Sequence, residues 1–217
     1  MRDFAKDPFA KLAIRDAVLR ECANKKFDLI DPKDVADVRD YLKTNIPPVI
    51  TDAIINSPEY QSILSGQLQY EFGIPDPGTK LSGLLNTWSN NVEIIYNPPI
   101  ISGNKIKASF SVNMIKIDFS DVLYSDYAVV VDNLRGYSLP WLEWLLLEGN
   151  KTIIQNYNVV IGPNRQSRTG MAIMKNASSS WRVPSQYAGT ISDNWITRAI
   201  DQAESQIQNV LDKAANL

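Results

Sequence analysis

The stretch that most constrains the fold is Lys105 to Phe119, KIKASFSVNMIKIDF. Apolar and polar residues alternate along its first ten positions, which is the pattern of a strand with one buried face and one exposed face. At Met114 and Ile115 the alternation slips by one residue. Such a slip moves the next apolar side chains to the opposite face unless a bulge re-aims the chain. We therefore predict one long, bent strand that is central in an antiparallel sheet.

Helical patterns dominate the chain before this strand. Three prolines follow a residue that can cap a helix, and proline is tolerated at the first helical position; the pairs are Asp7-Pro8, Asp31-Pro32 and Ser57-Pro58. We predict helices over residues 8–24, from Pro32 onward, and over 58–68. We expect Pro47-Pro48 to end or kink the second helix, with a further helical stretch over 49–55.

Short elements surround the long strand. Residues 72–80, FGIPDPGTK, predict a loop in which Thr79 caps the next helix, and residues 81–88 carry an apolar stripe. Residues 92–96 predict a strand that Asn97-Pro98-Pro99 closes. The short connection favours antiparallel pairing of this strand with the long one.

The last third combines strands with two helices. Pro140 predicts the start of a helix over WLEWLLLEG, which Gly149 caps. Residues 152–161 and 171–174 favour strands, and residues 127–131 favour either a strand or a segment that flanks a helix. From Ser192 or Asp193 onward, apolar residues recur every three or four positions and predict an amphipathic helix: Ile196, Ile200, Ala203, Ile207, Val210 and Ala214.

These patterns predict an α+β fold with a small antiparallel sheet, a helical N-terminal portion and a C-terminal amphipathic helix. We expect a helical portion over residues 1–75 and an α+β core domain over 76–217, or else one continuous domain. With 217 residues, the chain is long enough to bury a core without disulfides or metals. It shows no signal peptide and no run long enough to span a bilayer, so we expect no membrane partner.

Charge is small overall but unevenly distributed. The net charge is −2, which gives no global signature of nucleic-acid binding. Residues 150–217 hold seven basic and four acidic side chains, or +3, and the remainder is −5. Opposite ends of opposite charge suit a protein that stacks between different neighbours. Ordinary variation in surface charge is the alternative.

Several kinds of catalytic site are excluded by composition. The chain has no histidine, which removes Ser-His-Asp and Cys-His nucleophiles and histidine metal sites. The single cysteine, Cys22, predicts a small buried side chain. The loop GPNRQSRTG, residues 162–170, does not match the spacing of a P-loop. Asp118, Asp121 and Asp126 are a candidate for a hard cation, with solvated loop acids as the alternative. We expect no cofactor, no metal and no enzymatic activity.

Two surface signals remain. Trp141, Trp144 and Leu145 place much apolar area on a short helix, so this helix is either core or partly a subunit interface. Arg165 and Arg168 share a loop, and Arg182 lies beside Trp181. These arginines suit a partner's acids or a phosphate backbone, and an ordinary exposed loop is the alternative.

Three segments of the last third resemble the neck proteins of tailed bacteriophages, the tail-completion or head–tail joining group. The segments are LPWLEWLLLEG (139–149), VVIGPNRQSRTGMAIM (159–174) and SWRVPSQYAGTISDNWITRAI (180–200). The resemblance covers about residues 80–217 and leaves the N-terminal helices unplaced. It implies a virion structural protein, assembled in the host cytoplasm, which forms a homo-oligomeric ring at the head–tail interface.

The resemblance also implies partners. A ring of six or twelve copies would join the portal or adaptor, or another neck protein, to the tail tube or terminator, with genomic DNA passing through the channel. By analogy, Arg165 and Arg168 would line the channel or meet the next ring, and the helix of Trp141 and Trp144 would pack between subunits. The full set of expected interface residues is Trp141, Trp144, Leu145, Arg165, Arg168, Trp181, Arg182 and Trp195.

Three other functions remain open from the sequence. A tail terminator ring belongs to the same assembly but has different neighbours. A carboxylate-metal enzyme would use Asp118, Asp121 and Asp126. A monomeric adaptor domain would bind a charged partner.

Overall fold

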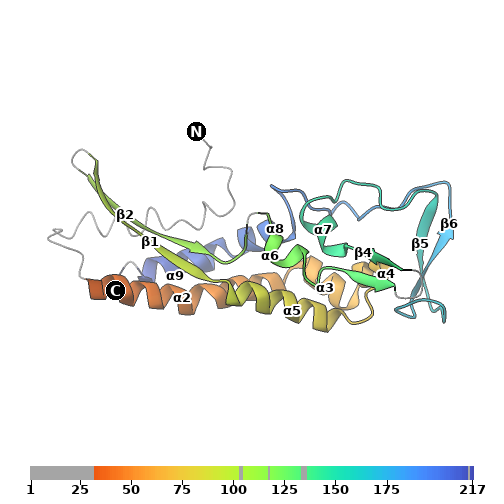
Figure 1. Cartoon of the computed structure of the whole chain (residues 1–217), viewed down its shortest axis with the longest axis horizontal. Coiled ribbons are helices and arrows are strands. Elements are labelled where there is room, and N and C mark those ends of the chain that lie inside the picture. The colour runs from red at the N-terminus through yellow and green to blue at the C-terminus, as the bar shows by residue number, and fades with distance from the viewer. Residues whose placement is uncertain (1–31, 103–104, 117, 133–135, 215) are drawn as a thin grey trace. The chain divides into compact units, whose positions relative to one another are not determined.

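The computed structural model describes residues 32–102, 105–116, 118–132, 136–214 and 216–217. The expected helix over 8–24 and Cys22 lie outside these residues. Figure 1 shows the described helices and strands. The helices are α2 (Pro32–Ile55), α3 (Pro58–Ser65), α4 (Gln67–Phe72), α5 (Pro77–Asn90), α6 (Ser120–Leu123), α7 (Trp141–Leu146), α8 (Trp195–Gln202) and α9 (Glu204–Ala214). The strands are β1 (Glu93–Ser102), β2 (Lys105–Asn113), β3 (Val130–Asp132), β4 (Tyr137–Leu139), β5 (Tyr157–Ile161) and β6 (Ala172–Asn176).

The fold is α+β, as the sequence predicted. The described strands form three antiparallel sheets of two strands each, β1–β2, β3–β4 and β5–β6. None of the described helices is long and apolar enough to cross a bilayer.

Contacts divide the chain into two compact units. The first comprises the described parts of Met1–Ala53, Ser89–Ile117 and Ile200–Leu217, and the second comprises Ile54–Trp88 and Asp118–Ala199. Each unit therefore combines segments that are distant in the sequence. Neither unit coincides with residues 1–75 or 76–217.

The β1–β2 ribbon belongs to the first unit and contains the alternating stretch. Phe110 and Val112 are buried, Asn113 is exposed, and Tyr96 packs on Phe110 with ring centroids 5.0 Å apart. The pairing with β1 is antiparallel, as predicted. The expected central position was wrong, because this sheet has only two strands. The strand is also shorter than predicted, because it ends at Asn113 and not at Phe119. Met114 and Ile115 are both buried, so the alternation of buried and exposed side chains stops there.

The expected end of β1 at Asn97-Pro98-Pro99 was also wrong. The strand continues to Ser102, with a register shift between Asn97 and Ile100. Proline lacks an N–H for the ladder but is tolerated on edge strands and at bulges. In a two-stranded ribbon both strands are edges, so the prolines are accommodated.

Helix α2 runs through Pro47 and Pro48 without ending there. An interior proline costs a helix about 3 kcal/mol through a lost hydrogen bond and a clash. Leu42, Ile46 and Ile50 are buried at a spacing of four, so one apolar face continues across the prolines. Packing of that face explains why α2 and the stretch expected over 49–55 form one helix.

Local capping explains the next helices. Ser57 begins α3 as predicted, accepting a hydrogen bond from the Tyr60 N–H at 3.2 Å. The predicted helix over 58–68 is divided at Gly66 into α3 and α4. Helix α5 begins at Pro77, because the Asp76 carboxylate accepts from the Thr79 N–H at 3.3 Å. The cap is therefore Asp76, and the prediction of Thr79 was wrong.

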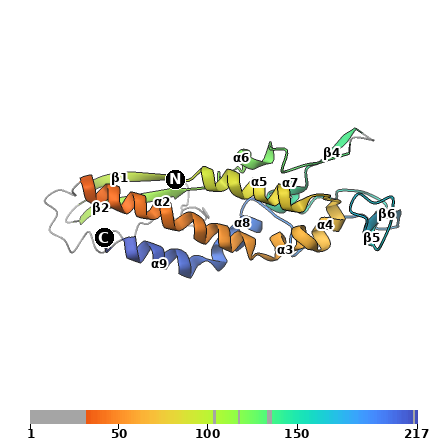
Figure 2. The same cartoon turned by 90° about the horizontal axis from the view of Figure 1, so that it is seen from below.

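The C-terminal helices are shorter than the sequence predicted. Helix α7 ends at Leu146 and its C-cap is Leu147, so the expected cap at Gly149 was wrong. The terminal helix is interrupted at Ala203, where α8 ends and α9 begins. Its predicted stripe is still buried at Ile196, Ile200, Ala203, Ile207 and Ala214. Figure 2 shows α9 running beside α2 of the same unit, as it does in Figure 1.

Candidate interaction surfaces

Phe72 is the centre of an aromatic cluster in the second unit. Trp144 stacks on it at 5.8 Å between ring centroids, Trp181 meets it edge-on at 5.9 Å, and Trp141 lies tilted at 6.2 Å. The Trp141 indole N–H donates to the Tyr127 carbonyl at 3.1 Å. The three tryptophans and Leu145 are buried. The structure therefore places the apolar helix α7 in the core of this unit.

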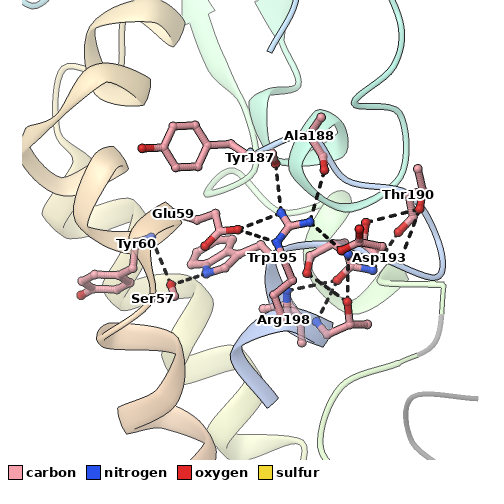
Figure 3. A network of polar contacts seen from close by, with 12 residues as sticks. Ser57, Glu59, Tyr60, Tyr187, Ala188, Thr190, Asp193, Trp195 and Arg198 are labelled. Carbon is pink, nitrogen blue, oxygen red and sulfur yellow. Dashed lines mark hydrogen bonds and ion pairs between the residues drawn. The ribbon is translucent and has the colours of Figure 1, made fainter. Parts of the chain in front are cut away.

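Trp195 joins the start of α8 to the start of α3. Its indole N–H donates to the Ser57 hydroxyl at 2.7 Å (Figure 3). Its ring meets Trp88 edge-on, with ring centroids 6.1 Å apart. Ser57 also donates to the Ile54 carbonyl at 2.6 Å. One serine thus caps α3 and satisfies a buried indole, and Trp195 is core as well.

Asn194 caps α8. Its side-chain oxygen accepts from the N–H groups of Ile196 and Thr197, each at 3.1 Å. The Thr197 hydroxyl accepts in return from the Asn194 N–H at 2.8 Å. This reciprocal arrangement satisfies amides that a helix start leaves unpaired. Sequence reasoning placed this start one or two residues early, at Ser192 or Asp193.

Arg198 connects α8 to four other residues of the second unit (Figure 3). Its Nε and Nη2 donate to Glu59 Oε1 at 2.8 and 2.7 Å, and Nη1 donates to Asp193 Oδ1 at 2.8 Å. The guanidinium also reaches the carbonyls of Tyr187 and Ala188 at 3.3 and 3.4 Å. The Glu59 side chain is only 3% exposed, so Arg198 neutralises a buried carboxylate.

Two glycines let α7 touch the segment around Gly189. The Gly189 N–H donates to the Trp144 carbonyl at 3.0 Å, and the Gly149 N–H donates to the Gly189 carbonyl at 2.9 Å. A Cβ on Gly189 would lie 1.9 Å from the Leu145 carbonyl oxygen. Only glycine permits so close an approach of two backbones.

The β5–β6 ribbon carries the loop of Arg165 and Arg168. Backbone hydrogen bonds extend the ribbon beyond its strands, from Gly162 to Met171 and from Ile154 to Trp181. Arg165 is exposed, whereas Arg168 reaches back to the Phe72 carbonyl at 3.5 Å. Gly73, in the left-handed region at φ +64°, leaves space for that guanidinium. Arg182 is exposed next to the buried Trp181.

Glu71 and Lys80 have shifted pKa values. Burial raises the pKa of Glu71, and the side chains of Gln67 and Trp181 partly offset the rise. Burial lowers the pKa of Lys80, and Asp126 and Asp76 oppose that shift. The Lys80 ammonium donates to the carbonyls of Asp126 and Val129 at 2.9 and 2.6 Å, which fixes the loop before β3.

The structure separates the expected interface residues into two groups. Trp141, Trp144, Leu145, Trp181 and Trp195 are buried, whereas Arg165, Arg168 and Arg182 lie at the surface. Sequence reasoning missed Phe72 and the Glu59–Arg198 pair. Nothing in the local pattern marks a phenylalanine before a loop as a cluster centre. The Asn194–Thr197 spacing, by contrast, is a readable capping signal.

The carboxylates proposed for a cation are not gathered into a metal site. Within the described ranges, no group of three or more Cys, Asp or Glu side chains is placed to hold a metal ion. Asp118 instead accepts from the Ser120 N–H at 3.1 Å at the start of α6.

The chain matches no protein-family model, and no curated protein or solved structure is significantly similar to it. A functional assignment therefore depends on the residues and contacts of this chain.

Proposed function

We propose that this chain is a virion structural protein of the head–tail neck of a tailed bacteriophage. In this role, identical copies form a ring between the portal or adaptor and the tail, around the DNA channel. The role needs no catalytic group and no cofactor. It needs a rigid subunit with separate surfaces for its neighbours in the ring.

The observation that carries the proposal is the connection among the three segments that resemble neck proteins. Residues 139–149 contact the segment 180–200 through the backbone pairs of Gly149, Gly189 and Trp144. Trp181, at the base of the β5–β6 ribbon, shares the Phe72 cluster with Trp144. The ribbon itself contains segment 159–174. Motifs that are separate in the sequence thus build one framework.

Burial of the tryptophans modifies what the resemblance implied. The buried side chains of α7 hold the subunit together, so they are unsuited to a contact between subunits. The exposed Arg165 on the β5–β6 ribbon remains suited to the channel or to the next ring. Neighbour contacts are therefore expected on the ribbon and its loop.

Reconstitution tests the proposal. Purified protein is added either to DNA-filled capsids that lack a neck or to isolated tails, from the phage that encodes the chain. Co-sedimentation of the chain with capsids, followed by restored joining to tails, is expected. Binding to tails alone would instead favour the terminator, which caps the tail tube.

Failure to bind either particle would contradict the proposal. A variant, Arg165→Glu, tests separately whether Arg165 lines the DNA channel. It should still bind capsids if Arg165 faces DNA, but with reduced delivery of DNA to host cells. Unchanged delivery of DNA would show that Arg165 does not act in the channel. The neck assignment would then depend on the capsid-binding result alone.

A further inference from the structure

The second unit contains two adjoining stretches of opposite charge. Residues 118–148 hold six acidic side chains against one basic, a net charge of −5. Residues 149–192 hold five basic side chains and no acid, a net charge of +5. The basic five are Lys151, Arg165, Arg168, Lys175 and Arg182, all of which are exposed. The charge of this unit is therefore separated along the sequence, with the ion pair between Lys151 and Glu148 close to the point where the two stretches meet.

The positive stretch also presents an apolar face. In an antiparallel pair, residues directly opposite each other share a face. Val159 pairs with Met174 and Ile161 with Ala172, so these four residues and Tyr157 lie on one face of the β5–β6 ribbon. Ile161 is 49% exposed and Met174 is 40% exposed. Lys175 is exposed on the opposite face of the same ribbon.

The negative stretch presents exposed apolar side chains too. Tyr124, just after α6, is 91% exposed, and Val131 on β3 is 56% exposed. Asp126 lies between them and is exposed. The Lys80 bonds to the carbonyls of Asp126 and Val129 hold this loop in place. Figure 2 shows α6 and the β5–β6 ribbon at separate places in the unit.

From these two surfaces we propose that the β5–β6 ribbon of one copy binds the Tyr124–Val131 surface of a second copy, head to tail. Each surface offers apolar area, and the exposed basic side chains of the ribbon and its loop complement the exposed Asp126 of the other surface. Two ribbons facing each other would instead bring like charges together, which disfavours a symmetric dimer through the ribbon. A head-to-tail contact uses different surfaces on each copy and generates a ring when its rotation closes.

The inference rests on the proposed ring and names the surfaces that would build it. A contact of this kind predicts that the wild-type protein associates in a concentration-dependent way. It also predicts that damage to either surface blocks self-association, while a copy damaged on one surface still binds a copy damaged on the other.

Sedimentation velocity of paired variants tests this contact. A ribbon variant carries Ile161→Asp and Met174→Asp, and a loop variant carries Tyr124→Ser and Val131→Ser. All four side chains are exposed, so both variants should keep the wild-type circular dichroism and Tm. Ile191→Asp, at a residue 63% exposed outside both surfaces, is the matched control.

The expected result has three parts. Wild-type protein and Ile191→Asp both self-associate, with a dissociation constant of about 1 mM or lower. Each surface variant alone binds itself at least tenfold more weakly. An equimolar mixture of the two variants forms a 1:1 dimer and nothing larger, since one intact ribbon and one intact loop surface remain.

Three results would overturn the inference. The loop variant alone could dimerise as strongly as wild type, which would indicate a symmetric contact through the ribbon. The mixture could stay monomeric, or the wild-type protein could remain monomeric at about 1 mM.

These outcomes are separate from those of the neck proposal. If the two surface variants join capsids to tails as well as wild type does, the contact is wrong and the neck role stands. If the mixture dimerises as expected but wild-type protein binds no capsid or tail, the contact stands and the neck role fails.

Discussion

Arg198 joins residues that lie far apart in the chain, since it pairs with Glu59 across 139 positions. Removing one partner of a buried ion pair leaves the other charge without compensation, which costs about 3–5 kcal/mol. Arg198→Ala is therefore expected to lower the free energy of unfolding by about that amount. Urea denaturation monitored by tryptophan fluorescence measures the change.

Arg182→Ala is the control, because Arg182 is exposed and such substitutions change stability by less than about 0.5 kcal/mol. An Arg198→Ala variant that is as stable as Arg182→Ala would show that the Glu59 carboxylate finds water or another partner.

Glu71 gives the protein a stability term that depends on pH. Burial raises its pKa above the ordinary value of 4.5, so the folded state holds the proton more tightly than the unfolded state does. The resulting contribution is fully present below pH 4.5 and is lost as pH rises through the raised pKa. At neutral pH, the partly buried carboxylate therefore destabilises the fold.

Glu71→Gln removes this charge and keeps the size of the side chain. We expect a higher Tm than wild type at pH 7 and a difference close to zero at pH 4, as measured by calorimetry. A variant that is less stable than wild type at pH 7 would indicate that the ionised carboxylate is needed, through its interactions with Gln67 and Trp181.

At the scale of elements, α7 is held by a backbone contact that tolerates no side chain. Gly189→Ala would place a Cβ 1.9 Å from the Leu145 carbonyl oxygen, so the backbone must move. We expect a loss of at least about 2 kcal/mol in unfolding free energy, at the upper part of the range for overpacking. Gly162→Ala is the matched control, since its Cβ would meet nothing within 4 Å.

Equal stability of the two glycine variants would contradict this account of α7. A loss of capsid binding by Gly189→Ala alone, with Tm unchanged, would instead indicate that the segment around Gly189 contacts a partner.

Local patterns predicted the elements better than their ends. The Ser57 cap, the β1–β2 pairing and the buried stripe of the terminal helix each follow from neighbouring residues. Of the two outcomes expected at Pro47-Pro48, an end of the helix was wrong, because packing of a buried face outweighed the local preference of proline. The strand end at Asn97-Pro98-Pro99 was also wrong, because an edge strand tolerates proline.

The candidate site was less predictable than the elements. Residues from other parts of the chain contact α7, including Phe72, which packs on Trp144, and Gly189, which donates to the Trp144 carbonyl. A sequence pattern shows that a tryptophan needs burial, but it does not show whether the cover comes from the same chain or from another one. The exposed position of Arg165 could be predicted from its loop composition.

At the scale of the whole molecule, opposite charges on the second unit predict that salt weakens self-association. The screening length falls from about 10 Å at 0.1 M to about 3 Å at 1 M ionic strength. Sedimentation at those two ionic strengths should show a dissociation constant that increases several-fold. Stronger association at high salt would indicate that apolar area alone drives the contact.

The copy number on reconstituted particles distinguishes a neck ring from other modes of binding. Purified protein is bound to neck-deficient, DNA-filled capsids, and the copies retained per capsid are counted by quantitative mass spectrometry against the portal subunit. A ring at the neck predicts a fixed number that does not rise with excess protein, six or twelve for the symmetries that the resemblance implies. No retention, or a number that rises without saturation, would contradict a role as the neck ring.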